Sequence, residues 1–150
     1  MKRWSQRVIT LAVALWAVTA YAPAYADAKS SSMADSKVVL QISDNDPSKQ
    51  ELVLNVANNL IEQYGQDQIA IEIVAFGPGM RLLFANNENK GRIQGLTTKN
   101  VRFSACKNTI TAMTKQLGYE PELNAKAVRV DAGAGRIMEL VKEGYVLIKP

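Results

Sequence analysis

Short apolar runs rich in β-branched residues alternate with helix-like segments along most of this chain. Such alternation is typical of βα units, which place helices over a sheet of parallel strands. The apolar runs predict five strands, at residues 38–42, 69–76, 101–105, 127–130 and 145–148. We therefore expect an α/β fold, a three-layer α/β/α sandwich built on a mainly parallel, five-stranded sheet.

Apolar residues spaced three and four apart predict helices between these strands. The clearest start signal is Asp46-Pro47, an N-cap acceptor followed by proline at the first helical position. This helix should end at Gly65, and its expected apolar face consists of Leu52, Val53, Val56, Ala57, Leu60, Ile61 and Tyr64. The other expected elements are a short helical turn at 80–84, a weak helix around Ile93 and Leu96, and helices at 108–117 and 136–142.

The first 26 residues have the three parts of a secretory signal peptide. A short basic segment precedes the apolar run at 8–20, and Ala24-Tyr25-Ala26 places small residues where a signal peptidase reads them. We expect cleavage after Ala26, a flexible lead-in at 27–36, one domain at 37–150, a periplasmic location and no stable membrane insertion after cleavage. The alternative is a retained membrane anchor, although the run is short for a span of about 20 residues.

Charge gives no indication of a nucleic-acid partner. The formal net charge is +4, but Lys2, Arg3 and Arg7 supply three of these charges, so the rest of the chain carries +1. A nearly neutral domain offers no electrostatic attraction to nucleic acid or to an anionic membrane.

The amino-acid inventory excludes several kinds of chemistry. The chain has no histidine, which excludes Ser-His-Asp and Cys-His catalysis and histidine-ligated metals. Its one cysteine, Cys106, excludes an internal disulfide and a CxxC redox motif. Asp44, Asp46 and Asp131 lie at strand ends, where they could bind a hard cation weakly or serve as loop and capping residues. No complete nucleotide-binding motif is present, and we expect no cofactor and no metal site.

Cys106 directly follows an expected strand and precedes an expected helix. The partial positive charge and unpaired N–H groups of a helix N-terminus favour thiolate over thiol, as does the adjacent Lys107. Because ligands of α/β sheets bind beyond the carboxyl ends of the strands, the candidate binding residues are Gly77, Gly79, Lys107, Asn108, Gly133 and Gly135. The alternatives are that Cys106 is a small buried hydrophobic residue and that the glycine pairs are ordinary tight turns.

Four pieces of the sequence resemble the DsrE/DsrF-like family, and most closely its secreted branch. They are residues 37–44 (KVVLQISD), 73–79 (IVAFGPG), 101–109 (VRFSACKNT) and 143–150 (EGYVLIKP), and the likeness covers 37–150. The resemblance implies a parallel α/β/α sandwich that assembles as a trimer or hexamer.

The resemblance also implies a role for Cys106. Characterised cytoplasmic relatives relay sulfur as a cysteine persulfide, and in their E-type subunit the carrier cysteine follows the third strand, where Cys106 stands. This chain departs from them after that cysteine: it continues Lys107-Asn108-Thr109-Ile110, where the carriers have an Ala-rich stretch that contains Arg-Gly.

These observations leave three hypotheses for function. The first is a periplasmic sulfur-handling protein, a sulfurtransferase or sulfur carrier, that carries or binds sulfur at Cys106 and exchanges it with a donor or acceptor protein. A lone thiol suits a carrier, because no second cysteine can expel the sulfur by forming a disulfide. The second is a non-catalytic oligomeric module that binds a small anion at the glycine loops, and the third is a structural oligomer in which Cys106 is packing.

Overall fold

The computed structural model describes residues 34–150, which form a single parallel sheet with helices around it. The expected signal peptide and most of the expected lead-in lie outside the described residues. Within residues 34–150, no helix has the length and apolar character needed to cross a membrane. The strands are β1 Ser36–Ile42, β2 Ile69–Ala75, β3 Arg102–Cys106, β4 Ala127–Val130 and β5 Val146–Ile148. The helices are α1 Pro47–Tyr64, the 3-10 helix η1 Gly77–Leu83, α2 Lys90–Thr98, α3 Lys107–Leu117 and α4 Gly133–Lys142.

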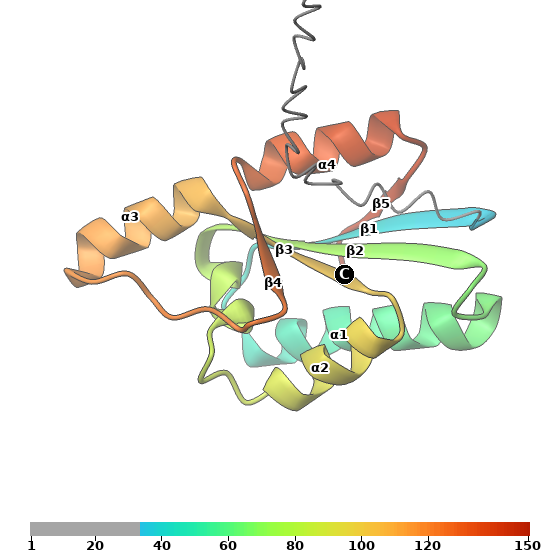
Figure 1. Cartoon of the computed structure of the whole chain (residues 1–150), viewed down its shortest axis with the longest axis horizontal. Helices are drawn as coiled ribbons and strands as arrows, with labels where there is room; N and C mark the ends of the chain where they lie inside the picture. The colour runs from blue at the N-terminus through green and yellow to red at the C-terminus, as the bar shows by residue number, and fades with distance from the viewer. Residues whose placement is uncertain (1–33) are drawn as a thin grey trace, which may run out of the picture. The chain divides into compact units, whose positions relative to one another are not determined.

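The strand order is β4-β3-β2-β1-β5, and every neighbouring pair is parallel. Helices α1 and α2 cover one face of the sheet and α4 covers the other, while α3 extends from the end of β3 (Figure 1). The expected α/β/α sandwich is therefore confirmed, with a sheet that is wholly rather than mainly parallel. The chain crosses the sheet in one direction from β1 to β4, and α4 carries it back over the opposite face to β5.

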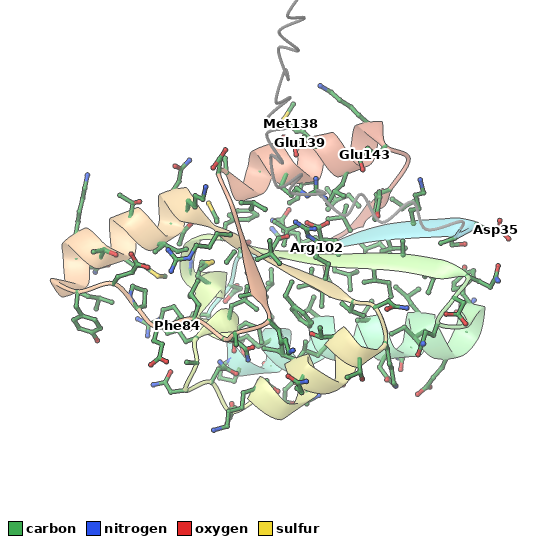
Figure 2. All side chains as sticks on the ribbon, in the orientation of Figure 1. Asp35, Phe84, Arg102, Met138, Glu139 and Glu143 are labelled. Atoms are coloured by element: carbon green, nitrogen blue, oxygen red, sulfur yellow. The ribbon has the colours of Figure 1, made fainter. Side chains whose placement is uncertain are left out.

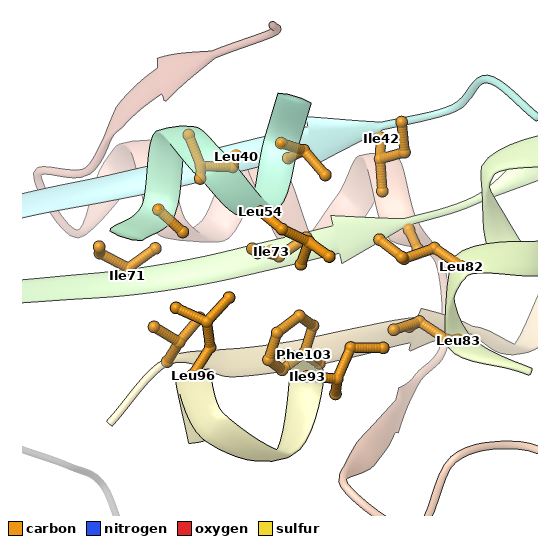
Figure 3. Close-up of a cluster of buried hydrophobic side chains, with 14 of the residues drawn as sticks. Leu40, Ile42, Leu54, Ile71, Ile73, Leu82, Leu83, Ile93, Leu96 and Phe103 are labelled. Atoms are coloured by element: carbon orange, nitrogen blue, oxygen red, sulfur yellow. The ribbon is translucent and has the colours of Figure 1, made fainter. Parts of the chain in front are cut away.

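The main hydrophobic core lies between the sheet and the layer of α1 and α2 (Figure 3). Alternate residues of each strand point to this face, as the two-residue period of a strand requires. The fully buried side chains of this layer include Leu40, Leu54, Ile73, Leu82, Leu83, Ile93 and Phe103. Each such side chain contributes about 1.5–3 kcal/mol when it leaves water, so this layer supplies most of the hydrophobic stabilisation.

The buried face of α1 differs from the expected one. Leu52 and Tyr64 are about half exposed, and the buried residues are Gln50, Val53, Leu54, Ala57 and Ile61. Two apolar stripes overlap on this helix, and only packing against the sheet selects between them. Gln50 lies inside the selected stripe because its side-chain oxygen accepts a hydrogen bond from Asn87 Nδ2 at 3.1 Å.

Helix α4 is the only cover of the second face within the part of the chain described here, and it begins at Gly133, earlier than expected. The apolar contact beneath it is small, formed by Val39, Val74, Ile137 and Leu140. Polar groups on the same face are also buried, notably Glu72 on β2 and Ser104 on β3. The position of α4 therefore depends on polar contacts as well as on hydrophobic burial.

Candidate functional site at Cys106

Cys106 is the last residue of β3 and the N-cap residue of α3. It pairs with Val130, the last residue of β4, so it lies at the carboxyl edge of the sheet beside the strand from which α4 departs. Ligand sites of α/β sheets form beyond this edge, where the direction of the connections reverses. The residue is only 5% exposed, which places its thiol below the surface.

Two helix N-termini meet at the Cys106 sulfur. The backbone N–H groups of Thr109, in the first turn of α3, and of Gly133, the first residue of α4, lie close to it and lower the pKa of its thiol. The Asn108 N–H also lowers this pKa, while it donates to the Asp131 carbonyl oxygen at 3.3 Å. Each helix N-terminus carries partial positive charge as well as unpaired N–H groups. Their convergence creates a site for a negatively charged sulfur.

The Thr109 hydroxyl completes this set of donors. Its oxygen accepts the Gly77 N–H at 2.9 Å, which leaves the hydroxyl proton free to point toward the Cys106 sulfur. The loop after β2 thereby orients a donor on α3. Three segments that are distant in sequence, 77, 106–109 and 133, are joined in one hydrogen-bonded unit.

The pKa of the Cys106 thiol reflects two opposed effects. Burial raises the pKa, while the Thr109 hydroxyl and the N–H groups of Gly133, Thr109 and Asn108 lower it by donating to the thiolate. The hydrogen bonds prevail, and the pKa lies below the ordinary thiol value. A larger fraction of the side chain is therefore thiolate, the nucleophilic form, near neutral pH.

Three of the predicted binding residues belong to this hydrogen-bonded unit. The N–H groups of Gly133 and Asn108 lower the pKa of the thiol, the latter while donating to the Asp131 carbonyl oxygen at 3.3 Å, and Gly77 acts through Thr109. A Cβ atom at Gly133 would lie 2.9 Å from Cβ of Phe76. Glycine at this position therefore allows the first turn of α4 to approach closely enough for its N–H to reach the sulfur.

The other predicted binding residues have different roles. The Lys107 ammonium lies 2.7 Å from Asp131 Oδ1, and both side chains are largely exposed, so Asp131 compensates its charge. Gly79 allows η1 to pack closely against the end of β1, because a Cβ there would lie 2.4 Å from the Ile42 carbonyl oxygen. Gly135 lines a separate cavity of about 390 Å³ near Arg102, on the α4 side.

The carboxylates at the strand ends act as capping and loop groups. Asp46 caps α1 by accepting the Ser48 N–H at 2.8 Å, and Asp44 accepts from Lys49 Nζ at 2.6 Å. Hydrogen bonds from these partners hold the pKa of both carboxyls below the usual range. Within residues 34–150, no three histidine, cysteine, aspartate or glutamate side chains gather as a metal site would require.

A buried ion pair that the sequence analysis missed anchors α4 beside the sulfur. The Glu72 carboxylate is almost completely buried and accepts from Arg136 Nε at 2.9 Å and Nη2 at 2.8 Å. Ser104 Oγ also donates to Glu72, at 2.5 Å. Arg136 lies in the turn of α4 that starts at Gly133, so this contact fixes the end of the helix that reaches Cys106. The sequence does contain a signal for this ion pair: Glu72 is an acidic residue inside the apolar run 69–76, and a buried charge is almost always paired.

The fold and the site define a small parallel α/β sandwich with one cysteine where two helix N-termini converge. A solved archaeal structure is similar over this domain: MTH1491 from Methanobacterium thermoautotrophicum, described as a protein of unknown function. The two sequences are 32% identical, the TM-score is 0.70, and the match covers 77% of this chain and 100% of the archaeal one. The chain therefore belongs to the same family as MTH1491. No family model and no curated protein matches it.

Proposed function

We propose that this protein is a periplasmic sulfur carrier of the DsrE/DsrF type, a sulfurtransferase component that holds sulfur on Cys106. The observation that carries the proposal is the convergence of two helix N-termini on a single thiol whose pKa is lowered. The resemblance of residues 37–150 to the DsrE/DsrF-like family supports it, as does the position of Cys106 after the third strand.

Loading would proceed by attack of the Cys106 thiolate on the terminal sulfur of a donor R–S–S–H. A bond forms between Sγ and the terminal sulfur, the donor S–S bond breaks, and the donor leaves as the thiolate R–S⁻ with the electron pair. The proton stays on the transferred sulfur, and the product is Cys106–S–S–H. Atoms and charge balance without an added oxidant or reductant.

Unloading uses the same hydrogen bonds. When an acceptor thiolate attacks the outer sulfur, Cys106 must leave as a thiolate. A thiol of lower pKa is the better leaving group, so donors that stabilise the Cys106 thiolate assist this step too. One set of N–H groups therefore serves both halves of the transfer.

Exposure to inorganic polysulfide should add the mass of one sulfur atom to the peptide that contains Cys106. Cys106→Ser should abolish this adduct and leave the circular dichroism spectrum and the unfolding midpoint almost unchanged, because the two side chains are similar in volume. Peptide mass spectrometry measures the adduct. An unmodified thiol in the folded wild-type protein would overturn the proposal and favour the anion-binding or structural hypotheses.

The pH dependence of alkylation supplies the matching control. Because only the thiolate reacts, the rate should rise with pH to a midpoint below about 8.5, the free-thiol value. Thr109→Val removes one donor to the thiolate, so the pKa rises and the midpoint of the alkylation profile moves to higher pH. Thr111→Val, the same substitution at an exposed position of α3, should leave the midpoint unchanged.

We also propose that the chain forms a homo-oligomer, as the family resemblance implies. The exposed apolar residues Met138 and Val141 on α4, with Val146 and Leu147 on the edge strand β5, support this proposal. Figure 2 shows Met138 on the side of α4 away from the sheet. Exposed apolar groups at an unpaired strand edge are typical of association surfaces.

Light scattering should give a mass of a trimer or hexamer. Val146→Lys, which places a charge at the β5 edge, should shift the mass toward the monomer. Leu52→Lys, at an exposed position of α1, should not. A wild-type protein that is monomeric at all accessible concentrations would contradict the proposal.

A further inference from the structure

A groove of about 420 Å³ lies between η1 and α3. Its lining includes Gly77, Pro78 and Arg81 from the first element and Asn108, Thr109 and Met113 from the second. Small-molecule sites typically have volumes of about 300–1,000 Å³, so the groove can hold a small organic compound.

The groove adjoins the hydrogen-bond donors of the thiol. Thr109 lines the groove and lowers the pKa of the Cys106 thiol through its hydroxyl and its N–H, and Gly77 lines the groove while orienting that hydroxyl. Because Cys106 is only 5% exposed, a slender group reaches its sulfur more readily than a bulky one. This geometry favours a small molecule whose reacting end is slender.

The charge of the groove favours an anion. Arg81 is exposed, and no carboxylate of residues 34–150 forms an ion pair with it. The groove lining contains no acidic residue. Two other cations near α3 are compensated, Lys107 by Asp131 and Arg129 by Glu120, and Lys115 of α3 does not line this groove.

We propose that this groove binds the sulfur donor, a small organic persulfide that carries a carboxylate. Arg81 binds the carboxylate, Pro78 and Met113 contact the organic part, and the terminal sulfur is directed toward Cys106. The transfer is the balanced attack described above, in which the donor leaves as R–S⁻. This inference rests on the proposed function, because it names the substrate class of the same site.

Three disulfides of similar length and different charge test the proposal: dithiodipropionate, hydroxyethyl disulfide and cystamine. Each reacts with the thiolate to give a mixed disulfide on Cys106 and releases one thiolate, and mass spectrometry follows the rate. In Arg81→Gln, the ratio of the anionic to the neutral rate should fall about five-fold, and the cationic rate should rise relative to the neutral one. Added salt should reduce the wild-type preference.

Arg92→Gln is the matched control, because it removes the same charge from α2. It should leave the ratio of the anionic to the neutral rate unchanged. An equal ratio in wild type and Arg81→Gln, with Cys106 still reactive, would overturn the groove assignment and leave the carrier function standing. Failure of all three probes to modify a Cys106 that inorganic polysulfide still loads would also overturn the groove assignment, and failure of polysulfide as well would overturn both proposals.

Discussion

Arg136→Met is expected to lower the free energy of unfolding by about 3–5 kcal/mol. The guanidinium makes two hydrogen bonds to the Glu72 carboxylate, which is almost fully buried between the sheet and α4. The substitution leaves this carboxylate desolvated with only the Ser104 hydroxyl and the more distant Arg102, 3.7 Å away. Domains are stable by about 5–15 kcal/mol, so the loss should be a large fraction of the total. Denaturant unfolding measures it.

Two further variants separate the buried charge from the loss of a large side chain. Glu72→Met combined with Arg136→Met should recover most of the stability, because replacing both partners of a buried pair with apolar residues is often nearly neutral. The remaining cost should be about 1 kcal/mol, for the Ser104 hydroxyl that loses its acceptor. Arg129→Met breaks the half-exposed pair with Glu120 and should cost about 1 kcal/mol or less. Equal losses in Arg136→Met and Arg129→Met would contradict this account.

Gly79→Ala should destabilise the protein by about 3 kcal/mol or more. The added Cβ would lie 2.4 Å from the Ile42 carbonyl oxygen and 2.8 Å from Ser43 Cα. Both are backbone atoms at the end of β1, in a tightly packed region, so the clash is relieved only by moving η1 or the strand end. The midpoint of denaturant unfolding should fall accordingly.

Gly95→Ala makes the same chemical change, but we expect it to raise the free energy of unfolding. Gly95 lies inside α2, and a Cβ there meets nothing within 4 Å. Alanine loses less conformational freedom than glycine on entering a helix, so this variant should gain about 0.5–1 kcal/mol. A loss of stability at Gly95 equal to that at Gly79 would show that steric contact is not the cause.

Local signals in the sequence account for most of the fold. Strands buried on both faces require nearly continuous apolar runs, which is why residues 38–42 and 69–76 are recognisable. The helix start at Asp46-Pro47 is recognisable because the carboxylate accepts the Ser48 N–H, a contact within two residues. The start of α4 is harder to predict, since Gly133 and Gly135 are poor helix formers and only tertiary contact makes them helical.

The candidate site depends on contacts that no local pattern encodes. The position of Cys106 between a strand and a helix follows from the residues around it. The Gly133 N–H arrives from another helix, and Thr109 is oriented by Gly77 across 32 positions of sequence. Arg136 and Glu72, which fix α4, are 64 positions apart. These pairings are set by strand order and by the return of α4 across the sheet.

Most of the donors to the Cys106 sulfur are main-chain amides, which no substitution of a side chain removes. Such a site is specified largely by the path of the backbone, to which the Thr109 hydroxyl adds a side-chain donor. The side chains of the stretch Lys107-Asn108-Thr109-Ile110 can thus vary while the amides keep their directions. Relatives with this chain path are expected to tolerate variation around the cysteine, provided that position 133 stays glycine and that proline, which lacks an N–H, is absent from positions 108 and 109.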